Sequence, residues 1–322
     1  MTRKTEKKSL LDSTQRMVLR ENVKSLLLRI FQTVIIVGIC YTVLAPILGI
    51  VANSFFSNKD AYNPMVYLIP MEPTLERYRV VADILDYWPT MLGSLLYSAT
   101  LTLCQILICS MVGYGFARFE FPFKKLLFGC VVFMIVIPPN LIMLPLYTTF
   151  KQLDPFGLCT AILGEPLSLM GTPWPMYIIT LFGCGLRSGL YIYIFNQFFR
   201  GMPKELEEAA FVDGAGTWYT YFRIMLRNAL PAVITVTVFS LVWQYNDTFY
   251  AKLFLVNKDM AIGVKISTLV MTIASQLLIY DGTVQSLYLD AGIVLMALPI
   301  VLIYVLLQKY FIEGVERSGI VG

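Results

Sequence analysis

Long apolar stretches without a charged residue are the feature that most limits what this chain can fold into. Three of them exceed the roughly 20 residues that a helix needs to cross a bilayer. These three are residues 30–58, 87–117 and 126–150. The other charge-free runs that we count toward spans are 166–186, 188–199, 228–246 and 291–308. Because only Arg187 separates the pair 166–186 and 188–199, we count that region once, and the sequence predicts six membrane-spanning helices.

The scarcity of charge supports a membrane location. Charged residues make up 14% of the chain and hydrophobic residues 57%, whereas a soluble domain usually carries about a quarter charged residues. The mean hydropathy is +0.69. We therefore expect an all-α, multi-pass protein of the cell membrane, in contact with lipid.

Residue types also limit the chemistry. The chain has no histidine, which excludes Ser-His-Asp and Cys-His nucleophilic catalysis and histidine-based metalloprotease helices. The six cysteines lie mostly in apolar runs and form no Cys-x-x-Cys pair, so they are expected to be packing residues rather than metal ligands. No spaced acid pair or activated nucleophile points to a membrane enzyme.

The orientation follows from the basic residues. Of 25 Lys and Arg, 17 lie in segments on one side of the six predicted spans and seven on the other, with Arg187 left over. The positive-inside rule then predicts that both termini are cytoplasmic. The predicted segments are a basic cytoplasmic stretch 1–29, a first span 30–53, an extracytoplasmic loop 54–86, a five-helix region 87–311 and a cytoplasmic tail 312–322.

The cytoplasmic loop 200–227 is the most informative segment. Pro203 is predicted to open a short helix, with carboxylates in its first turns where the helix dipole favours them. These carboxylates are Glu205, Glu207 and Glu208. Asp213-Gly214 predicts a turn in which glycine takes a positive φ.

A second short helix is predicted to begin with Thr217 as its N-cap. Its apolar residues recur at i, i+3, i+4 and i+7, which predicts one apolar stripe. These residues are Trp218, Tyr221, Phe222 and Met225. Two readings remain open: the stripe docks into a groove on a soluble partner, or it lies on the membrane surface.

This loop resembles the Glu-Ala-Ala loop of permeases in binding-protein-dependent ABC importers. The matching residues are Glu208-Ala209-Ala210, Asp213, Gly214, Ile224 and Leu226. The family commonly has proline after this leucine, whereas this chain has Arg227. The resemblance implies that the loop fits a cleft on an ATP-binding subunit and transmits its closure. The coupling residues it implies are Glu208, Ala209, Ala210, Asp213, Gly214, Trp218 and Phe222.

Most of the chain is similar to carbohydrate-uptake permeases of the maltose type. The similar segments are 73–78, 113–122, 138–147, 197–206 and 243–247. In the last of them Tyr245 stands where the family usually has tryptophan. Residues 308–314 resemble the tail of the second permease of the pair, although this chain ends in Val321-Gly322 rather than Lys-Gly.

The resemblance implies the six-helix type I ABC importer permease fold and a defined set of partners. These are a second permease that forms a heterodimer with this chain, two ATP-binding subunits and an extracytoplasmic solute-binding protein. The chain has no Gly-x-x-x-x-Gly-Lys-Ser/Thr loop, so ATP is expected to be bound and hydrolysed by the partner subunits. We expect no cofactor, metal or nucleic acid.

Arg187 is the most unusual candidate for the translocation path. A fourth span from about 175 to 199 places it in mid-membrane, where a charge normally marks a pathway or a buried pair. It would then contact sugar hydroxyls, or pair with Glu165 or Asp247. The alternative reading puts the span at 166–186 and Arg187 at the inner interface.

Other path candidates lie in the third and fifth spans. Pro138, Pro139 and Pro145 free backbone carbonyls, which is typical of kinked helices that line a cavity. Asn246 and Asp247, with Tyr245, lie late in the fifth span. Because Trp243 and Tyr250 lie nearby, an aromatic belt at the outer interface is the alternative.

The sequence thus predicts a permease subunit of an ATP-driven sugar or oligosaccharide importer. An ABC permease for a non-sugar solute is an alternative. An ion-coupled secondary transporter is another, but only Asp247 and Asp290 approach the membrane and no inverted repeat is visible. A non-transporting scaffold would leave the Glu-Ala-Ala loop unexplained.

Overall fold

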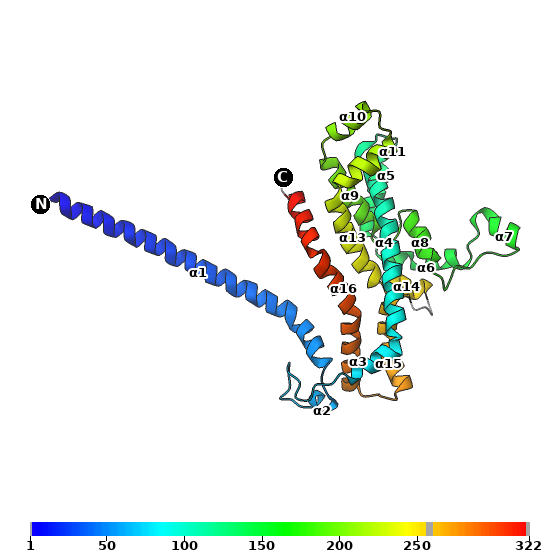
Figure 1. The fold of residues 1–322 in the computed structure, drawn as a ribbon, viewed down its shortest axis with the longest axis horizontal. Helices are drawn as coiled ribbons and strands as arrows, with labels where there is room; N and C mark the ends of the chain where they lie inside the picture. The colour runs from blue at the N-terminus through cyan, green and yellow to red at the C-terminus, as the bar shows by residue number, and fades with distance from the viewer. Residues whose placement is uncertain (1, 256–259, 320–322) are drawn as a thin grey trace. The chain divides into compact units, whose positions relative to one another are not determined.

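The computed structural model describes the backbone of residues 2–255 and 260–319, and within these ranges it consists of helices and turns. The only strand-like pairing there is an isolated bridge between Leu153 and Leu167. The helices (Figure 1) are α1 Thr2–Asn53, α2 Asn58–Ala61, α3 Glu76–Leu85, α4 Tyr87–Arg118, α5 Lys124–Val136, α6 Pro139–Lys151, η1 Pro155–Gly157, α7 Leu158–Leu163, α8 Trp174–Leu181, α9 Ser188–Gly201, α10 Glu205–Val212, α11 Thr217–Tyr219, η2 Thr220–Met225, α12 Leu226–Asn228, α13 Leu230–Tyr245, α14 Phe249–Phe254, α15 Ile262–Gln276 and α16 Gly282–Gly319.

The chain divides into two units, Met1–Thr74 and Leu75–Gly322. The first unit is dominated by α1, whose segment Lys24–Asn53 is long and apolar enough to cross a membrane. None of the side chains in that apolar segment is buried within the chain. Such a helix satisfies its own backbone hydrogen bonds and leaves its side chains for lipid or a partner subunit. The predicted first span, residues 30–53, lies entirely within it.

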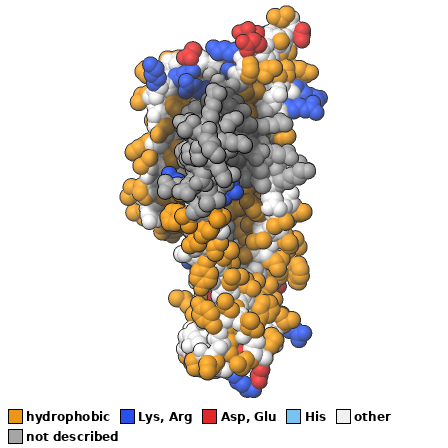
Figure 2. Space-filling model, turned by 90° about the vertical axis from the view of Figure 1, so that its left-hand side faces the viewer, with side chains coloured by type: hydrophobic (Ala, Val, Ile, Leu, Met, Phe, Trp, Pro, Cys, Tyr) orange, Lys and Arg blue, Asp and Glu red, His pale blue; other side chains and the backbone are white. Residues whose placement is uncertain are grey.

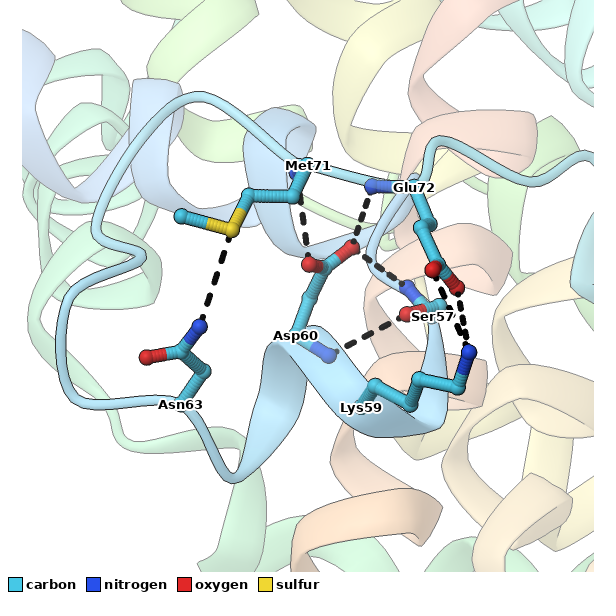
Figure 3. Close-up of polar contacts among 6 residues, drawn as sticks. All are labelled: Ser57, Lys59, Asp60, Asn63, Met71 and Glu72. Atoms are coloured by element: carbon cyan, nitrogen blue, oxygen red, sulfur yellow. Dashed lines mark hydrogen bonds and ion pairs between the residues drawn. The ribbon is translucent and has the colours of Figure 1, made fainter.

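After α1, a carboxylate holds the loop of the first unit together (Figure 3). The Asp60 side chain accepts hydrogen bonds from the backbone N–H groups of Ser57, Met71 and Glu72, each at 3.2 Å. An ion pair of 3.1 Å joins Lys59 to Glu72 beside it. Burial alone would raise the pKa of Asp60, but these hydrogen bonds outweigh burial and hold its pKa below the ordinary value. The carboxylate therefore stays charged at neutral pH.

The second unit is built around α4. This helix packs against α9 and α13, α9 also packs against α5, and α16 packs against α13, α15 and α3. Gly113 lets α4 approach α9 closely, because a Cβ there would lie 2.6 Å from the Phe195 Cβ. Figure 1 shows α10 and α11 at one end of this unit, and α3 and α15 at the opposite end.

The surface matches a membrane protein. In Figure 2, hydrophobic side chains dominate the described surface in view, and most of the charged ones gather near its upper and lower ends. Among the residues that the structure describes, three helices are long and apolar enough to cross a membrane, and up to five spans result if each of two bent helix pairs counts once. The helices and their composition therefore support a multi-pass protein, and the predicted count of six stays a prediction.

Two helix pairs are sharply bent. The chain bends by 103° between α5 and α6, at Ile137 and Pro138, where the sequence predicted a break, and Pro145 lies inside α6. It bends by 76° between the segment Thr217–Asn228 and α13. Proline explains the first bend, since it removes a backbone donor and disfavours helical backbone in the preceding residue.

The region 175–199, one reading of the fourth span, is interrupted rather than a single helix. The helix α8 ends at Leu181 and α9 begins at Ser188. Gly183 has φ of 73° and donates its N–H to the Thr180 carbonyl, while Cys184 donates to Ile179. This hydrogen-bond pair is a Schellman motif, in which a glycine with left-handed backbone closes a helix. Gly183 was the sequence signal for this break.

Two further details differ from expectation. The first short helix of the loop begins at Glu205 with Lys204 as its N-cap, so Pro203 lies just outside the helix rather than at its first position. Gly216, not Thr217, is the N-cap of the second. The tail predicted at 312–322 lies partly outside the described residues; the described backbone continues as α16 to Gly319.

Candidate functional site

In the loop between α9 and α13, one face of α10 is exposed and the opposite face is buried. Its carboxylates lie in the first turn, where the positive end of the helix dipole stabilises them. Glu207 and Ala210 are buried, whereas Glu208 and Ala209 are exposed. The helix therefore packs on the rest of the unit with one side and leaves Glu208 and Ala209 free on the other.

The turn after α10 has the predicted geometry. Asp213 is the C-cap of the helix, and Gly214 has φ of 81°. The N–H of Ala215 donates to the Ala210 carbonyl at 2.9 Å, and that of Gly214 donates to Phe211 at 3.0 Å. A residue with a side chain would be strained at this φ. Nothing lies within 4 Å of the position where a Cβ would be, so the requirement for glycine comes from the backbone alone.

The prediction of one apolar stripe on the second short helix is wrong. Tyr221 and Met225 are buried, at 2% and 0% exposure. Trp218 and Phe222 are 65% and 47% exposed, and their rings stack with centroids 6.1 Å apart. The reason is that residues 220–225 form a π-helical turn, whose i→i+5 bonding shifts the side-chain spacing away from the α-helical pattern.

The exposed face of the loop therefore combines an acidic side chain, a small residue and two stacked rings. Phe211 and Val212 add 46% and 86% exposed apolar side chains. No cluster of acids and cysteines that could hold a metal occurs among the described residues. Such a face can bind a partner.

The comparison with protein families now decides the class of the chain. Residues 105–317 match the model of the binding-protein-dependent transport system inner membrane component. The chain belongs to this family of ABC transporter permeases. Its place is therefore in the cell membrane as a multi-pass transport protein, and the family is one of permeases rather than enzymes.

Similar permeases are known by name. The chain is 26% identical over 287 residues to the arabinooligosaccharides transport system permease protein AraQ of Halalkalibacterium halodurans, covering 88% of this chain and 93% of that protein. It is 29% identical to the melibiose/raffinose/stachyose import permease protein MelC of Bacillus subtilis, covering 68% and 71% of the two chains. A solved bacterial ABC transporter involved in import of the acidic polysaccharide alginate shares the fold, with a TM-score of 0.63, 20% identity, and coverage of 88% and 97%.

Within the membrane part of the permease, Arg187 lies in the break between α8 and α9. It has φ of 61° and is exposed, and its guanidinium carbon lies 4.4 Å from the centroid of the Trp243 ring. No ion pair joins it to Glu165 or Asp247 in the part of the chain described, so the predicted pairing is wrong. A cation over an indole face is attractive, but it leaves the charge unneutralised.

Asp247 is engaged elsewhere. Its carboxylate accepts the backbone N–H groups of Phe249, Tyr250 and Ala251 at 3.0–3.2 Å and so caps the start of α14. This is the physical reason that it does not pair with Arg187.

The other path candidates differ in burial. Tyr245 is 2% exposed, and its hydroxyl donates to the Met296 carbonyl at 3.0 Å, which places it in the packing against α16. Asn246 is exposed and donates to Val242, and Pro139 is half-buried at the start of α6. The fold thus places Arg187 against Trp243, whereas Pro139 lies on a different helix, α6.

Gln105 is a buried residue of the site that sequence reasoning missed. It is completely buried in α4. Its amide donates to the Leu186 carbonyl at 2.6 Å and to the Ser188 hydroxyl at 3.3 Å, and its carbonyl accepts from Ser240 and Gln244. It thus ties the break beside Arg187 to the helix that carries Trp243. The sequence signal was present, because buried polar residues recur along α4 at helical spacing. They are Thr90, Ser94, Ser98, Thr102 and Gln105.

A second missed pair lies at the C-terminal end of α4. The Arg118 Nε lies 3.2 Å from the Glu207 Oε1, with side-chain exposures of 6% and 11%. From the sequence, Arg118 was counted only among the basic residues that set the orientation, and so this ion pair was not predicted.

Proposed function

We propose that the chain is a membrane permease subunit of an ATP-driven importer and that its loop 200–227 docks on an ATP-binding subunit. The observation that carries this proposal is the exposed face of the loop. Glu208, Ala209, Trp218 and Phe222 are exposed on a loop whose turn is set by Gly214. A soluble domain with a complementary cleft can bury such a face in a helix-in-groove contact.

The transported solute is a sugar or oligosaccharide in this proposal. Its support is the named function of the relatives, which include permeases for arabinooligosaccharides, for melibiose, raffinose and stachyose, and for diacetylchitobiose. The candidate contact on this chain is Arg187 over Trp243, because aromatic faces pack on sugar rings while a guanidinium donates to hydroxyls. Asn246 is exposed on the same element as Trp243 and is a further candidate.

The partners follow from the same proposal. A second permease completes the pathway, two ATP-binding subunits supply and hydrolyse ATP, and an extracytoplasmic binding protein delivers the solute. Six spans with both termini in the cytoplasm put loop 200–227 on the side of the ATP-binding subunits. The chain itself uses no cofactor and carries out no bond-breaking chemistry.

Glu208→Lys in the assembled transporter is expected to lower co-purification of the ATP-binding subunit by about tenfold or more, because it reverses a charge at the centre of the docking face. The matched control is Glu165→Lys, an equal charge reversal at an exposed position outside loop 200–227, because Glu205 lies three residues before Glu208 and shares its face of α10. Equal recovery of the ATP-binding subunit in the two variants would contradict the proposal.

A further inference from the structure

In the proposed function, the exposed face of loop 200–227 contacts the ATP-binding subunit. Its buried face packs against α4. Arg118 is the last residue of α4, and its guanidinium contacts Glu207 of α10 at 3.2 Å. It also donates to the Met202 carbonyl at 2.9 Å, at the end of α9. Neither the Arg118 Nε nor the Glu207 Oε1 has a hydrogen-bond partner elsewhere, and the Tyr114 hydroxyl of α4 also interacts with the Glu207 carboxylate. The charge of buried Glu207 is therefore compensated by two residues of α4, Arg118 and Tyr114.

The second short helix of the loop also contacts α4. The Tyr221 hydroxyl lies 2.6 Å from the Ser110 hydroxyl, and both residues are buried. The ring of Tyr114 packs 5.1 Å from the Tyr221 ring and 5.4 Å from the Phe199 ring. Both short helices of the loop are thus attached to one helix, at Arg118 and at Ser110.

The same helix holds the membrane part of the site. Gln105 lies 13 residues before Arg118 in the sequence, which corresponds to about 20 Å along a helix. It contacts Leu186 and Ser188, on both sides of Arg187, and Ser240 and Gln244, on both sides of Trp243. One unbroken helix therefore connects the coupling loop with the pair Arg187 and Trp243.

We propose that α4 transmits movement of the coupling loop to the α8–α9 break, and that Arg118 and Glu207 are the positioning residues that attach the loop to it. This inference rests on the proposed function. Moving α10 away from α4 would separate two buried charges, which is costly in a poorly hydrated site. The pair therefore forces α10 and the end of α4 to move together.

The experiment uses the complete transporter reconstituted in vesicles and measures two quantities: recovery of the ATP-binding subunit, and the ratio of solute transported to ATP hydrolysed. Glu207→Gln and Arg118→Met are expected to keep the ATP-binding subunit, because the exposed face is unchanged. They are expected to lower the transport ratio by a factor of about 5–150, the usual range for coupling between sites. The exchanged pair, Arg118→Glu with Glu207→Arg, is expected to restore part of this ratio.

The matched control is Glu120→Gln, which breaks the 2.8 Å ion pair between Glu120, two residues after the end of α4, and Lys124 of α5. This pair is exposed at Glu120, so its loss is expected to leave the ratio unchanged. An unchanged ratio in Glu207→Gln, with the ATP-binding subunit bound, would overturn the inference and leave the proposed function standing. Loss of subunit binding in both single variants, without recovery in the exchanged pair, would also overturn it. Failure of the proposed function is detected separately, by Glu208→Lys.

Discussion

Replacing Gly214 with valine is expected to remove most of the ATP-driven transport of the assembled complex. Gly214 has φ of 81°, and a β-branched residue in this region costs about 1–3 kcal/mol. The turn that it forms positions α10 against the second short helix, and α10 is only eight residues long. A short helix has little intrinsic stability to resist that strain. Recovery of the ATP-binding subunit with the purified complex measures the effect.

Gly216→Ala is the matched control for this prediction. Gly216 has an ordinary φ of −76°, and nothing lies within 4 Å of a Cβ built there. Its substitution adds a methyl group two residues away without strain. If Gly214→Val and Gly216→Ala retain the ATP-binding subunit equally well, the left-handed turn is not needed for docking.

Gln105→Leu is expected to have the next largest effect, on the membrane part of the site. The substitution leaves the Leu186 carbonyl and the Gln244 amide without their shared partner, whereas the Ser240 hydroxyl keeps the Thr102 hydroxyl at 2.9 Å. Orphaned buried polar groups cost about 1–3 kcal/mol, although measured hydrogen bonds between membrane helices average about 0.6 kcal/mol. We expect the local stability of the α8–α9 break to fall by an amount between these values, because more than one group loses its partner. Amide hydrogen exchange of residues 182–190 is expected to become about tenfold faster.

Ser98→Ala is the control for Gln105→Leu. Ser98 is buried in α4, and its hydroxyl donates only to the Ser94 carbonyl of the same helix. Adding Gln244→Leu to Gln105→Leu removes the buried Gln244 amide that the single variant leaves without its acceptor, and is expected to recover part of the loss. If Ser98→Ala and Gln105→Leu change the amide hydrogen exchange of residues 182–190 equally, Gln105 does not stabilise the break between α8 and α9.

The apolar runs predicted the class of fold well because composition alone decides which segments can enter lipid. The charge-free run 87–117 corresponds to α4 Tyr87–Arg118, and 228–246 contains α13 Leu230–Tyr245. Hydropathy does not register where a helix stops inside an apolar run. The end of α8 depends on the backbone of Gly183, and its Schellman motif involves no charged residue.

The coupling loop was predicted in part. Gly214 was expected to take a positive φ, and it does, because only glycine adopts that backbone without strain. The stripe failed because a π-helical turn changed the side-chain spacing after Thr220, and an α-helical period cannot anticipate this change. Side-chain partners were missed for a similar reason. Arg118 and Glu207 are 89 positions apart in the sequence, and only the packing of α4 on α10 brings them together.

The central claim is that this permease moves its solute with energy from ATP bound to partner subunits. The most direct test measures uptake of a labelled oligosaccharide into vesicles that hold the complete transporter, with ATP supplied on the side of loop 200–227. The account predicts that uptake requires ATP and is lost in Glu208→Lys, with no uptake driven by a proton or sodium gradient alone. Uptake driven by an ion gradient in the absence of ATP would contradict it.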